Sequence, residues 1–428
     1  MSFKPLFGRS LSADPARLHF AAHSHHLWPD ASFEGQMAAW DDAARLADRK
    51  WDKVMDQAWP EAQANVAREL GTDAPDGIVF SSSTHDFLVR LVTAAPRRTP
   101  GPLRVLTTDG EFHSARRQFA RWEEAGWISV DRIAAEPFES LSDRFLAAAS
   151  GGEHDFIMAS QVLFGSGRLI GRIEELAALG RAEGPWVVID GYHAFMAIPD
   201  PLPLAGGEKP RSGEGEGLSA TDMPSPMLEN GPSRNGSFSS IPPASGRGSS
   251  AFYLGGGYKY AMAGEGCAFM HAPPAFGPRP PVTGWFAEFE DLTLPPGSVG
   301  YAADARRFLG ATFDPSGLYR FNAVQRMLAE NGLTTARISA HVAGLQRQLV
   351  DSIGDAALGR AELLNPLEGG AHARFLAFRS PNAALWYEAL KRQNCITDVR
   401  GDVFRIGFGI YQDAADVERL IQLLGGLQ

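Results

Sequence analysis

The sequence predicts an α/β protein in which a large domain with a mainly parallel sheet precedes a smaller C-terminal α+β domain. Between residues 76 and 190, short apolar segments that end in polar turns alternate with helical segments. This alternation is typical of a parallel sheet with helices on both faces. From about residue 320, two helical segments precede three strand-like segments and a final helix. The chain has 428 residues, 44% of them hydrophobic, which is enough for more than one core.

The large domain follows one plan. Residues 30–70 have apolar residues at helical spacing. A strand, a polar turn and a helix then occupy residues 76–95, with Ser83 or Thr84 as a suitable N-cap. The plan repeats with a strand at 103–107 and a helix from about 114. It repeats again with a buried strand at 155–164, followed by a turn and helix at 165–184. An apolar strand at 185–190 ends the series.

Polar residues follow each of these strands. Ligands of such sheets bind at the carboxyl ends of the strands. We therefore expect the site among four segments, which are Ser81–Thr84, Asp109–His113, Ser160–Gly167 and Asp190–His193.

Residues 201–250 break the pattern, because Gly, Pro and Ser make up more than half of them. Such a segment has too few apolar side chains to offset its ordering entropy, so we expect a flexible insertion between two core strands. The expected domains are an N-terminal arm and helix over residues 1–50, the large domain over 51–290 and the small domain over 291–428.

The bulk composition predicts a cytoplasmic globular protein. The net charge is -10 and no basic stripe stands out, which disfavours nucleic acid and anionic membranes as partners. The first residues lack the apolar core of a signal peptide, and no apolar run approaches the ~20 residues of a membrane helix. Two cysteines provide no disulfide framework.

The stretch GSGRLIG at residues 165–171 supports one alternative function. It follows a strand, precedes a helical segment, and has Asp190 about twenty residues later at a strand end. This spacing is similar to a dinucleotide fingerprint, so an NAD(P)- or FAD-dependent oxidoreductase is one hypothesis. Against it, the fingerprint usually lies on the first strand of its unit, and glycine-rich turns are common for packing reasons.

Lys259 indicates a different chemistry. It lies in YLGGGYKYAMAGEG, between two tyrosines and among glycines and apolar residues. Such a setting disfavours the charged form of lysine and leaves a nucleophilic amine. Lysines of this kind form Schiff bases with pyridoxal 5'-phosphate (PLP).

The other groups that PLP needs are present in the sequence. Asp190 can keep the pyridine nitrogen protonated, although an ordinary helix cap is its simpler role. Hydroxyls at a helix start can hold the phosphate, and an aromatic ring can stack on the pyridine. An arginine on a strand can bind the substrate carboxylate, although an outward position is about as compatible with the alternation. The residues in these three roles are Ser83, Thr84 and Tyr258 for the phosphate, Phe112 for the ring and Arg405 for the carboxylate.

These residues together resemble the class V aminotransferase superfamily of fold-type I PLP enzymes, and kynureninase most of all. The resemblance rests on VVIDGYHAF, FYLGGGYKYAMAGEGCAFM, GWF and VFRIGFGIY, and extends over residues 76–420 apart from the insertion. It implies that Lys259 carries the cofactor and that Asp190 faces the pyridine nitrogen. It also implies a homodimer with shared active sites. The further contacts that it implies are His193 and Ser160 with the cofactor, and Trp285 and Thr312 with the phosphate of the neighbouring subunit.

Two departures from kynureninase fall on substrate-facing positions. Kynureninases have a Gly-Asn-Ser-Leu-Gly type stretch near their start, where this chain has FAAHSHHLWPDAS, and Thr312 stands where many have asparagine. We expect His23 or His26 at the active-site mouth, in proton transfer. His23 and His25 share one face of an extended segment and could ligate a metal, but no further ligand completes a set, so no metal site is expected.

The positions of the two cysteines indicate whether the chain could be a cysteine desulfurase. Cysteine desulfurases share this fold and use a cysteine on a mobile loop shortly before the arginine. Cys395 lies ten residues before Arg405, but its neighbours are typical of a strand, so we expect a buried thiol there. We expect Cys267 in the core as well.

The sequence therefore predicts a PLP-dependent enzyme that acts on an amino acid, by Cβ–Cγ hydrolytic cleavage or by transamination. The alternatives are the dinucleotide oxidoreductase and a non-catalytic protein that keeps the PLP fold for binding.

Overall fold

The computed structural model describes residues 2–199, 201, 250–274, 276, 279–288, 295, 297–354, 356–367 and 370–427. The expected insertion at 201–250 lies almost entirely outside these residues. Among the residues described, no helix is both long and apolar enough to cross a membrane.

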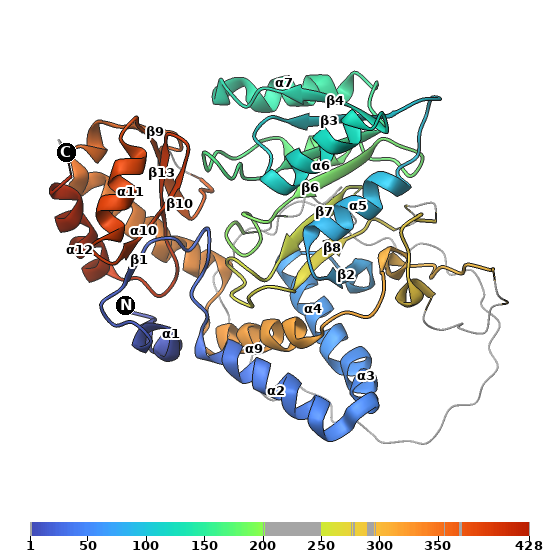
Figure 1. The fold of residues 1–428 in the computed structure, drawn as a ribbon, viewed down its shortest axis with the longest axis horizontal. Coiled ribbons are helices and arrows are strands. Elements are labelled where there is room, and N and C mark those ends of the chain that lie inside the picture. The colour runs from blue at the N-terminus through green and yellow to red at the C-terminus, as the bar shows by residue number, and fades with distance from the viewer. Residues whose placement is uncertain are drawn as a thin grey trace, which may run out of the picture.

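A seven-stranded sheet forms the centre of the large domain (Figure 1). Its order is β2 (Ile78–Ser81), β8 (Ala268–His271), β7 (Phe252–Gly256), β6 (Trp186–Asp190), β5 (Phe156–Ser160), β3 (Leu103–Thr108) and β4 (Ile128–Ile133). Only β8 runs antiparallel to its neighbours. The other strands are parallel, so their carboxyl ends meet at one edge. The apolar runs of β5 and β6 suit strands that are buried on both faces.

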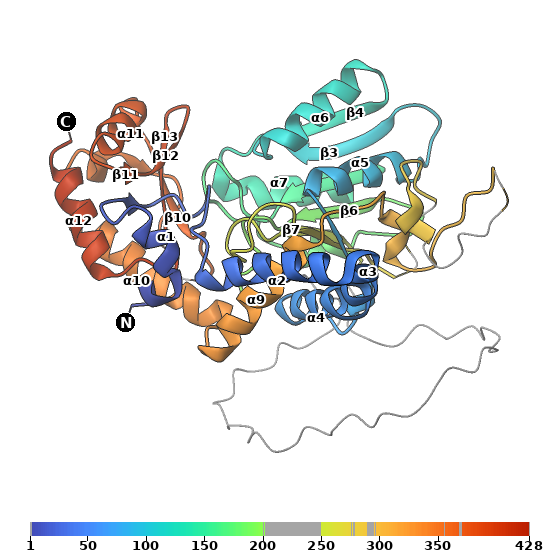
Figure 2. The same ribbon diagram turned by 60° about the horizontal axis from the view of Figure 1, so that its bottom comes forward.

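Helices cover this sheet. The helices that follow its strands are α5 (Thr84–Ala94), α6 (His113–Glu124), α7 (Phe138–Ser150) and α8 (Ile173–Ala177). A second group gathers below the sheet in both views (Figures 1 and 2), and consists of α2 (Asp30–Leu46), α3 (Lys50–Lys53), α4 (Trp59–Leu70) and α9 (Ser316–Glu330). Within it, α9 packs along α2 and α4.

The small domain is a four-stranded antiparallel sheet with three helices. Its strand order is β12 (Asp398–Arg400), β13 (Val403–Gly407), β10 (Phe375–Arg379) and β9 (Glu362–Leu363). The helices are α10 (Thr335–Ile353), α11 (Ala383–Lys391) and α12 (Ala414–Gly425). Asp413 caps α12 in a reciprocal capping box with Asp416, which satisfies two backbone N–H groups.

The N-terminal arm joins the small domain. After α1 (Gly8–Ser12), β1 (Leu18–His19) pairs in parallel with β11 (Cys395–Ile396), and Ala21 bridges Gly407. Figures 1 and 2 show the arm beside the C-terminal elements, although it begins the chain. The arm therefore reaches Gly407 at the end of β13, two residues after Arg405.

The two hydrophobic cores divide the chain differently from the expected boundary at residue 291. Leu318, Phe321 and Val324 of α9 belong to the core of the large domain. The second core takes Leu18 and Phe20 of the arm and many of the apolar residues after Val342, although Phe375 and Tyr411 belong to the first core. The reason is that α9 buries its apolar face against α2 and α4, a long-range contact that helical spacing does not reveal.

The GSGRLIG stretch forms a turn rather than the start of a helix. Val162 bridges Leu169 across it, and α8 begins only at Ile173 and is five residues long. The dinucleotide hypothesis therefore lacks the helix N-terminus on which a pyrophosphate would rest.

Candidate active site

A cavity of about 440 Å³ opens at the carboxyl edge of the large sheet and extends to the small domain. All four of the expected segments contribute to its lining, together with the arm. The lining residues are His23, Ser24, Ser82, Ser83, Thr84, His85, Phe112, Ser114, Ser160, Val162, Phe164, Asp190, Tyr192, His193, Tyr258, Lys259, Glu265, Gly266, Arg400 and Arg405.

Lys259 lines this cavity and follows the end of β7. Its Nζ donates a hydrogen bond to the main-chain carbonyl of His23 and lies 5.9 Å from the centre of the Tyr192 ring. Burial and the positive charge of Arg405 lower the pKa of Lys259 to about 7. A substantial fraction of this amine is therefore uncharged and nucleophilic near neutral pH.

Asp190 ends β6 and faces the same cavity. Its Oδ1 accepts a hydrogen bond from the backbone N–H of Tyr192 at 3.0 Å. Burial raises the pKa of Asp190, while that hydrogen bond and the charge of Lys259 oppose the rise. A carboxylate in this position would gain from a cationic partner in the cavity.

His193 follows at the end of the same turn. Its ring is buried, its centre lies 5.6 Å from that of Phe375, and its Nδ1 has no hydrogen-bond partner among the described residues. Burial lowers the pKa of His193 well below its ordinary value, so the ring is neutral. A buried nitrogen without a partner is costly unless a bound group satisfies it.

The N-terminus of α5 provides a candidate anion site. Ser83 is the N-cap, and its Oγ accepts from the backbone N–H of Asp86 at 3.3 Å. Ser82, Thr84 and His85 line the cavity beside it. Tyr258 also lines the cavity, and its hydroxyl lies 3.2 Å from His25 Nδ1. The free N–H groups and the dipole of an eleven-residue helix favour a phosphate at this end.

Ser160 and Phe112 also line the cavity. Phe112 precedes α6, is 45% exposed as a residue, and meets Phe164 edge-on at 5.4 Å between ring centres. Ser160 ends β5 directly beside Asp190 in register. Ser160 lines the cavity and hydrogen-bonds, behind the lining, to a carboxyl group that the sequence did not single out.

That carboxyl group belongs to Glu111, which is fully buried. It accepts hydrogen bonds from the Ser160 hydroxyl, from the Ser160 N–H at 3.2 Å and from the Thr108 hydroxyl at 2.6 Å. Burial raises the pKa of Glu111 to about 7. In the sequence, the one sign of this site was that Glu111 is an acidic residue in the polar turn after β3.

Arg405 lies at the small-domain end of the cavity, in the middle of β13 and buried. One guanidinium nitrogen donates to the main-chain carbonyl of Phe164 and the other to Asp398 Oδ2. Its Nε has no hydrogen-bond partner among the described residues. The alternation left an inward and an outward position about equally open, and in the structure Arg405 is buried. The sequence analysis did not predict a site role for Asp398, although the sequence shows this acidic residue two positions before Arg400.

The histidines of the arm separate into two roles. His23 lines the cavity, its ring stacks on Phe375 at 4.6 Å between centres, and its Nε2 lies 3.3 Å from Asp398 Oδ2. The structure does not place His26 at the mouth. Its ring is buried and packs against Phe7 and Tyr411, outside the cavity lining. In the described part of the chain, no cluster of His, Cys, Asp and Glu could hold a metal ion.

Trp285 and Thr312 lie outside the lining of this cavity. Trp285 Nε1 donates to Thr312 Oγ1 at 3.1 Å, and the indole is 44% exposed. Their expected contact with the phosphate of a neighbouring subunit therefore stays a prediction.

Both cysteines are buried and neither lines the cavity. Burial raises the pKa of Cys395 in β11 and of Cys267 to about 12. The expectation of inert thiols is therefore consistent with their surroundings, and no thiolate nucleophile is available here.

Comparison with solved structures establishes the fold. The chain is similar to a cysteine desulfurase from Thermococcus onnurineus, with 15% identity over 99% of this chain and 98% of that chain and a TM-score of 0.73. It is similar to a mutant of C-DES with glycine covalently linked to the PLP cofactor, with 14% identity over 100% of both chains and a TM-score of 0.74. It also resembles the cysteine desulfurase CsdA from Escherichia coli, with 12% identity over 99% and 96% of the chains and a TM-score of 0.73.

The chain therefore has the α/β fold of these fold-type I PLP-dependent enzymes, as the sequence predicted. No known family profile and no curated protein sequence matches it. None of the three structures is a kynureninase, so that resemblance stays a prediction.

Proposed function

We propose that this chain is a PLP-dependent enzyme that acts on an amino acid. The observation that supports it most is the Lys259 amine, whose pKa is lowered to about 7 by burial, in one cavity with Asp190 and Arg405. The cavity lining fits the cofactor, because it combines an amine for the aldehyde, a helix N-terminus for the phosphate and a carboxyl group for the ring nitrogen. The unpartnered Nδ1 of His193 adds a donor or acceptor.

The chain's own residues then have definite roles. Lys259 would hold the aldehyde and afterwards move the Cα proton of the substrate as general base. Asp190 would keep the proton on the pyridine nitrogen. Ser83, Thr84 and Tyr258 would hold the phosphate. The bound cofactor would supply an electron sink for a substrate carbanion.

Three further residues complete the proposal. Phe112 would stack on the cofactor ring, and Ser160 would contact the cofactor. Arg405 would bind the substrate carboxylate, although its guanidinium group contacts Asp398 and Phe164 in this structure. We also propose a cytoplasmic homodimer, in which Trp285 and Thr312 reach the phosphate of the partner's site.

The reaction that we favour is Cβ–Cγ hydrolytic cleavage or transamination. The desulfurases in the comparison are named for their action on cysteine. Removal of sulfur by a cysteine nucleophile would need a thiol in the cavity, whereas Cys267 and Cys395 are both buried outside its lining. This observation favours reactions in which water or a keto acid is the second reactant.

Reduction with borohydride tests the proposal. Protein purified with ample PLP should absorb near the visible, and borohydride should abolish the band and leave the label on the Lys259 peptide in mass spectrometry. Lys259→Ala is the control and should not be labelled. An unmodified Lys259 would refute the proposal, and nicotinamide or flavin binding in its place would favour the oxidoreductase. A labelled protein whose spectrum no amino acid changes would indicate the non-catalytic alternative. A spectral screen of amino acids, kynurenine included, would identify the substrate.

A further inference from the structure

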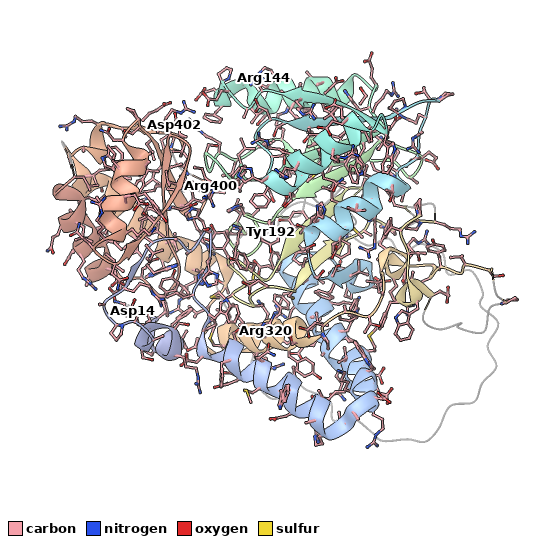
Figure 3. The ribbon with its side chains drawn as sticks, in the orientation of Figure 1. Asp14, Arg144, Tyr192, Arg320, Arg400 and Asp402 are labelled. Carbon is pink, nitrogen blue, oxygen red and sulfur yellow. The ribbon has the colours of Figure 1, made fainter. Side chains whose placement is uncertain are left out.

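Two arginines and one carboxylate meet at the small-domain end of the cavity. Asp398 on β12 lies directly opposite Arg405 on β13. Its Oδ2 accepts from Arg405, and its Oδ1 lies 2.9 Å from a guanidinium nitrogen of Arg400. Both arginines line the cavity. In Figure 3, Arg400 lies between Tyr192 of the large domain and Asp402 at the tip of the β12–β13 hairpin.

This cluster has one net positive charge. Burial opposes the ionisation of Asp398, but its contacts with His23, Arg405 and Arg400 outweigh burial and hold its pKa well below the usual range. The carboxylate is therefore charged. The third neighbour, His23, is neutral, because burial lowers its pKa to about 3. Two arginines and one carboxylate leave a single unit of charge.

We infer that Asp398 determines substrate specificity, by cancelling one arginine so that the site takes an amino acid with a single carboxylate. This inference rests on the proposed function. The α-carboxylate would neutralise the remaining unit of charge. A second carboxylate at this end would lie near Asp398 with no cation left to pair with it, and like charges in a partly buried site repel strongly.

The opposite holds when Asp398 is made neutral. Asp398→Asn keeps the shape and a hydrogen-bonding group, but leaves Arg400 and Arg405 both uncompensated. A substrate with two carboxylates could then pair with both arginines. The specificity should shift toward dicarboxylic amino acids, while the contacts of Lys259 with the cofactor remain.

The test compares L-glutamine with L-glutamate, which have nearly the same shape and differ in charge. PLP-loaded protein is titrated with each, and the apparent Kd is read by calorimetry and from the cofactor spectrum. The wild type should bind glutamine about tenfold tighter than glutamate. Asp398→Asn should reduce this ratio to about one or reverse it. Asp402→Asn, which removes an exposed carboxylate on the same hairpin, is the matched control and should leave the ratio unchanged.

A second variant covers a failure of Asp398→Asn to fold or to bind PLP. Arg400→Gln removes the more exposed of the two arginines. It should weaken the binding of glutamate more than the binding of glutamine, so the ratio of their Kd values should widen. Four results would overturn the inference: wild-type protein that prefers glutamate or does not discriminate, no binding of glutamine, an unchanged ratio in Asp398→Asn, or an unchanged ratio in Arg400→Gln. Protein without PLP on Lys259 would instead refute the proposed function itself.

Discussion

At the residue scale, the setting of Lys259 is decided by groups that are remote in the chain. The glycines and tyrosines around it make an apolar pocket, but the positive charge that acts on it comes from Arg405, and its hydrogen-bond acceptor is the carbonyl of His23. The same is true of Glu111, whose carboxyl group accepts a hydrogen bond from Ser160 at the end of β5, the neighbour of β3 in the sheet. Local sequence therefore predicts the reactive residue, whereas its proton affinity depends on the tertiary structure.

The lowered pKa of Lys259 has a consequence for stability. The unfolded chain holds this proton up to the ordinary value of 10.5, whereas the folded chain releases it at about 7. The unfolded state binds more protons between these values, so the contribution of Lys259 to stability rises with pH across that window.

Lys259→Met should therefore stabilise the protein without PLP most at about pH 6, and the gain should shrink by about 2–4 kcal/mol toward pH 10. Urea unfolding at several pH values measures it. Lys391→Met, at an exposed lysine, is the control and should show no such trend. A gain that is independent of pH would contradict the lowered pKa.

At the element scale, the start of α5 is the feature that gives the cavity an anion-binding end. Ser83 caps the helix, and the carboxylate of Asp86 accepts from the hydroxyls of Ser81 and Ser82. The sequence allowed Ser83 or Thr84 as the cap, and Ser83 has that role. A strand, a serine-rich turn and an amphipathic helix were enough to predict this element.

Ser83→Ala should weaken the binding of PLP about tenfold more than that of pyridoxal, because only PLP carries the phosphate that rests on the helix start. The loss of the cap should also cost about 1 kcal/mol of stability. Fluorescence titration with the two compounds measures the ratio. Ser114→Ala, at a serine of α6 that also lines the cavity, is the control. Equal losses for PLP and pyridoxal would exclude a phosphate contact at Ser83.

At the scale of the whole molecule, the cavity depends on how three parts of the chain come together. The sheet edge provides Asp190 and Lys259, β12 and β13 provide Arg400 and Arg405, and the arm provides His23. β1 pairs with β11 across nearly the whole length of the sequence. Trp285 and Thr312, like His26, are predicted site residues that this single chain does not bring to its own cavity.

If those two residues act on the partner's site, inactive variants should complement one another. Lys259→Ala and the double variant Trp285→Ala with Thr312→Ala should each be inactive. Refolded together in equal amounts, they should regain about a quarter of the wild-type activity, because half of the dimers then contain one intact site. Sedimentation should show the dimer. A mixture that stays inactive while dimers form would place both residues in a structural role within their own subunit.

The sequence by itself determined the alternation of strands and helices, and with it the parallel sheet, the edge at which the cavity opens and the polar turns that line it. Period and turn chemistry are local properties, so Ser83, Asp190 and Lys259 could be chosen from them. The tertiary structure decided what depends on packing between distant segments. It buried His26 beside Tyr411, placed α9 in the first core, and brought Asp398 between Arg405 and His23. Pairing between strands and burial, which are long-range, fixed those three outcomes.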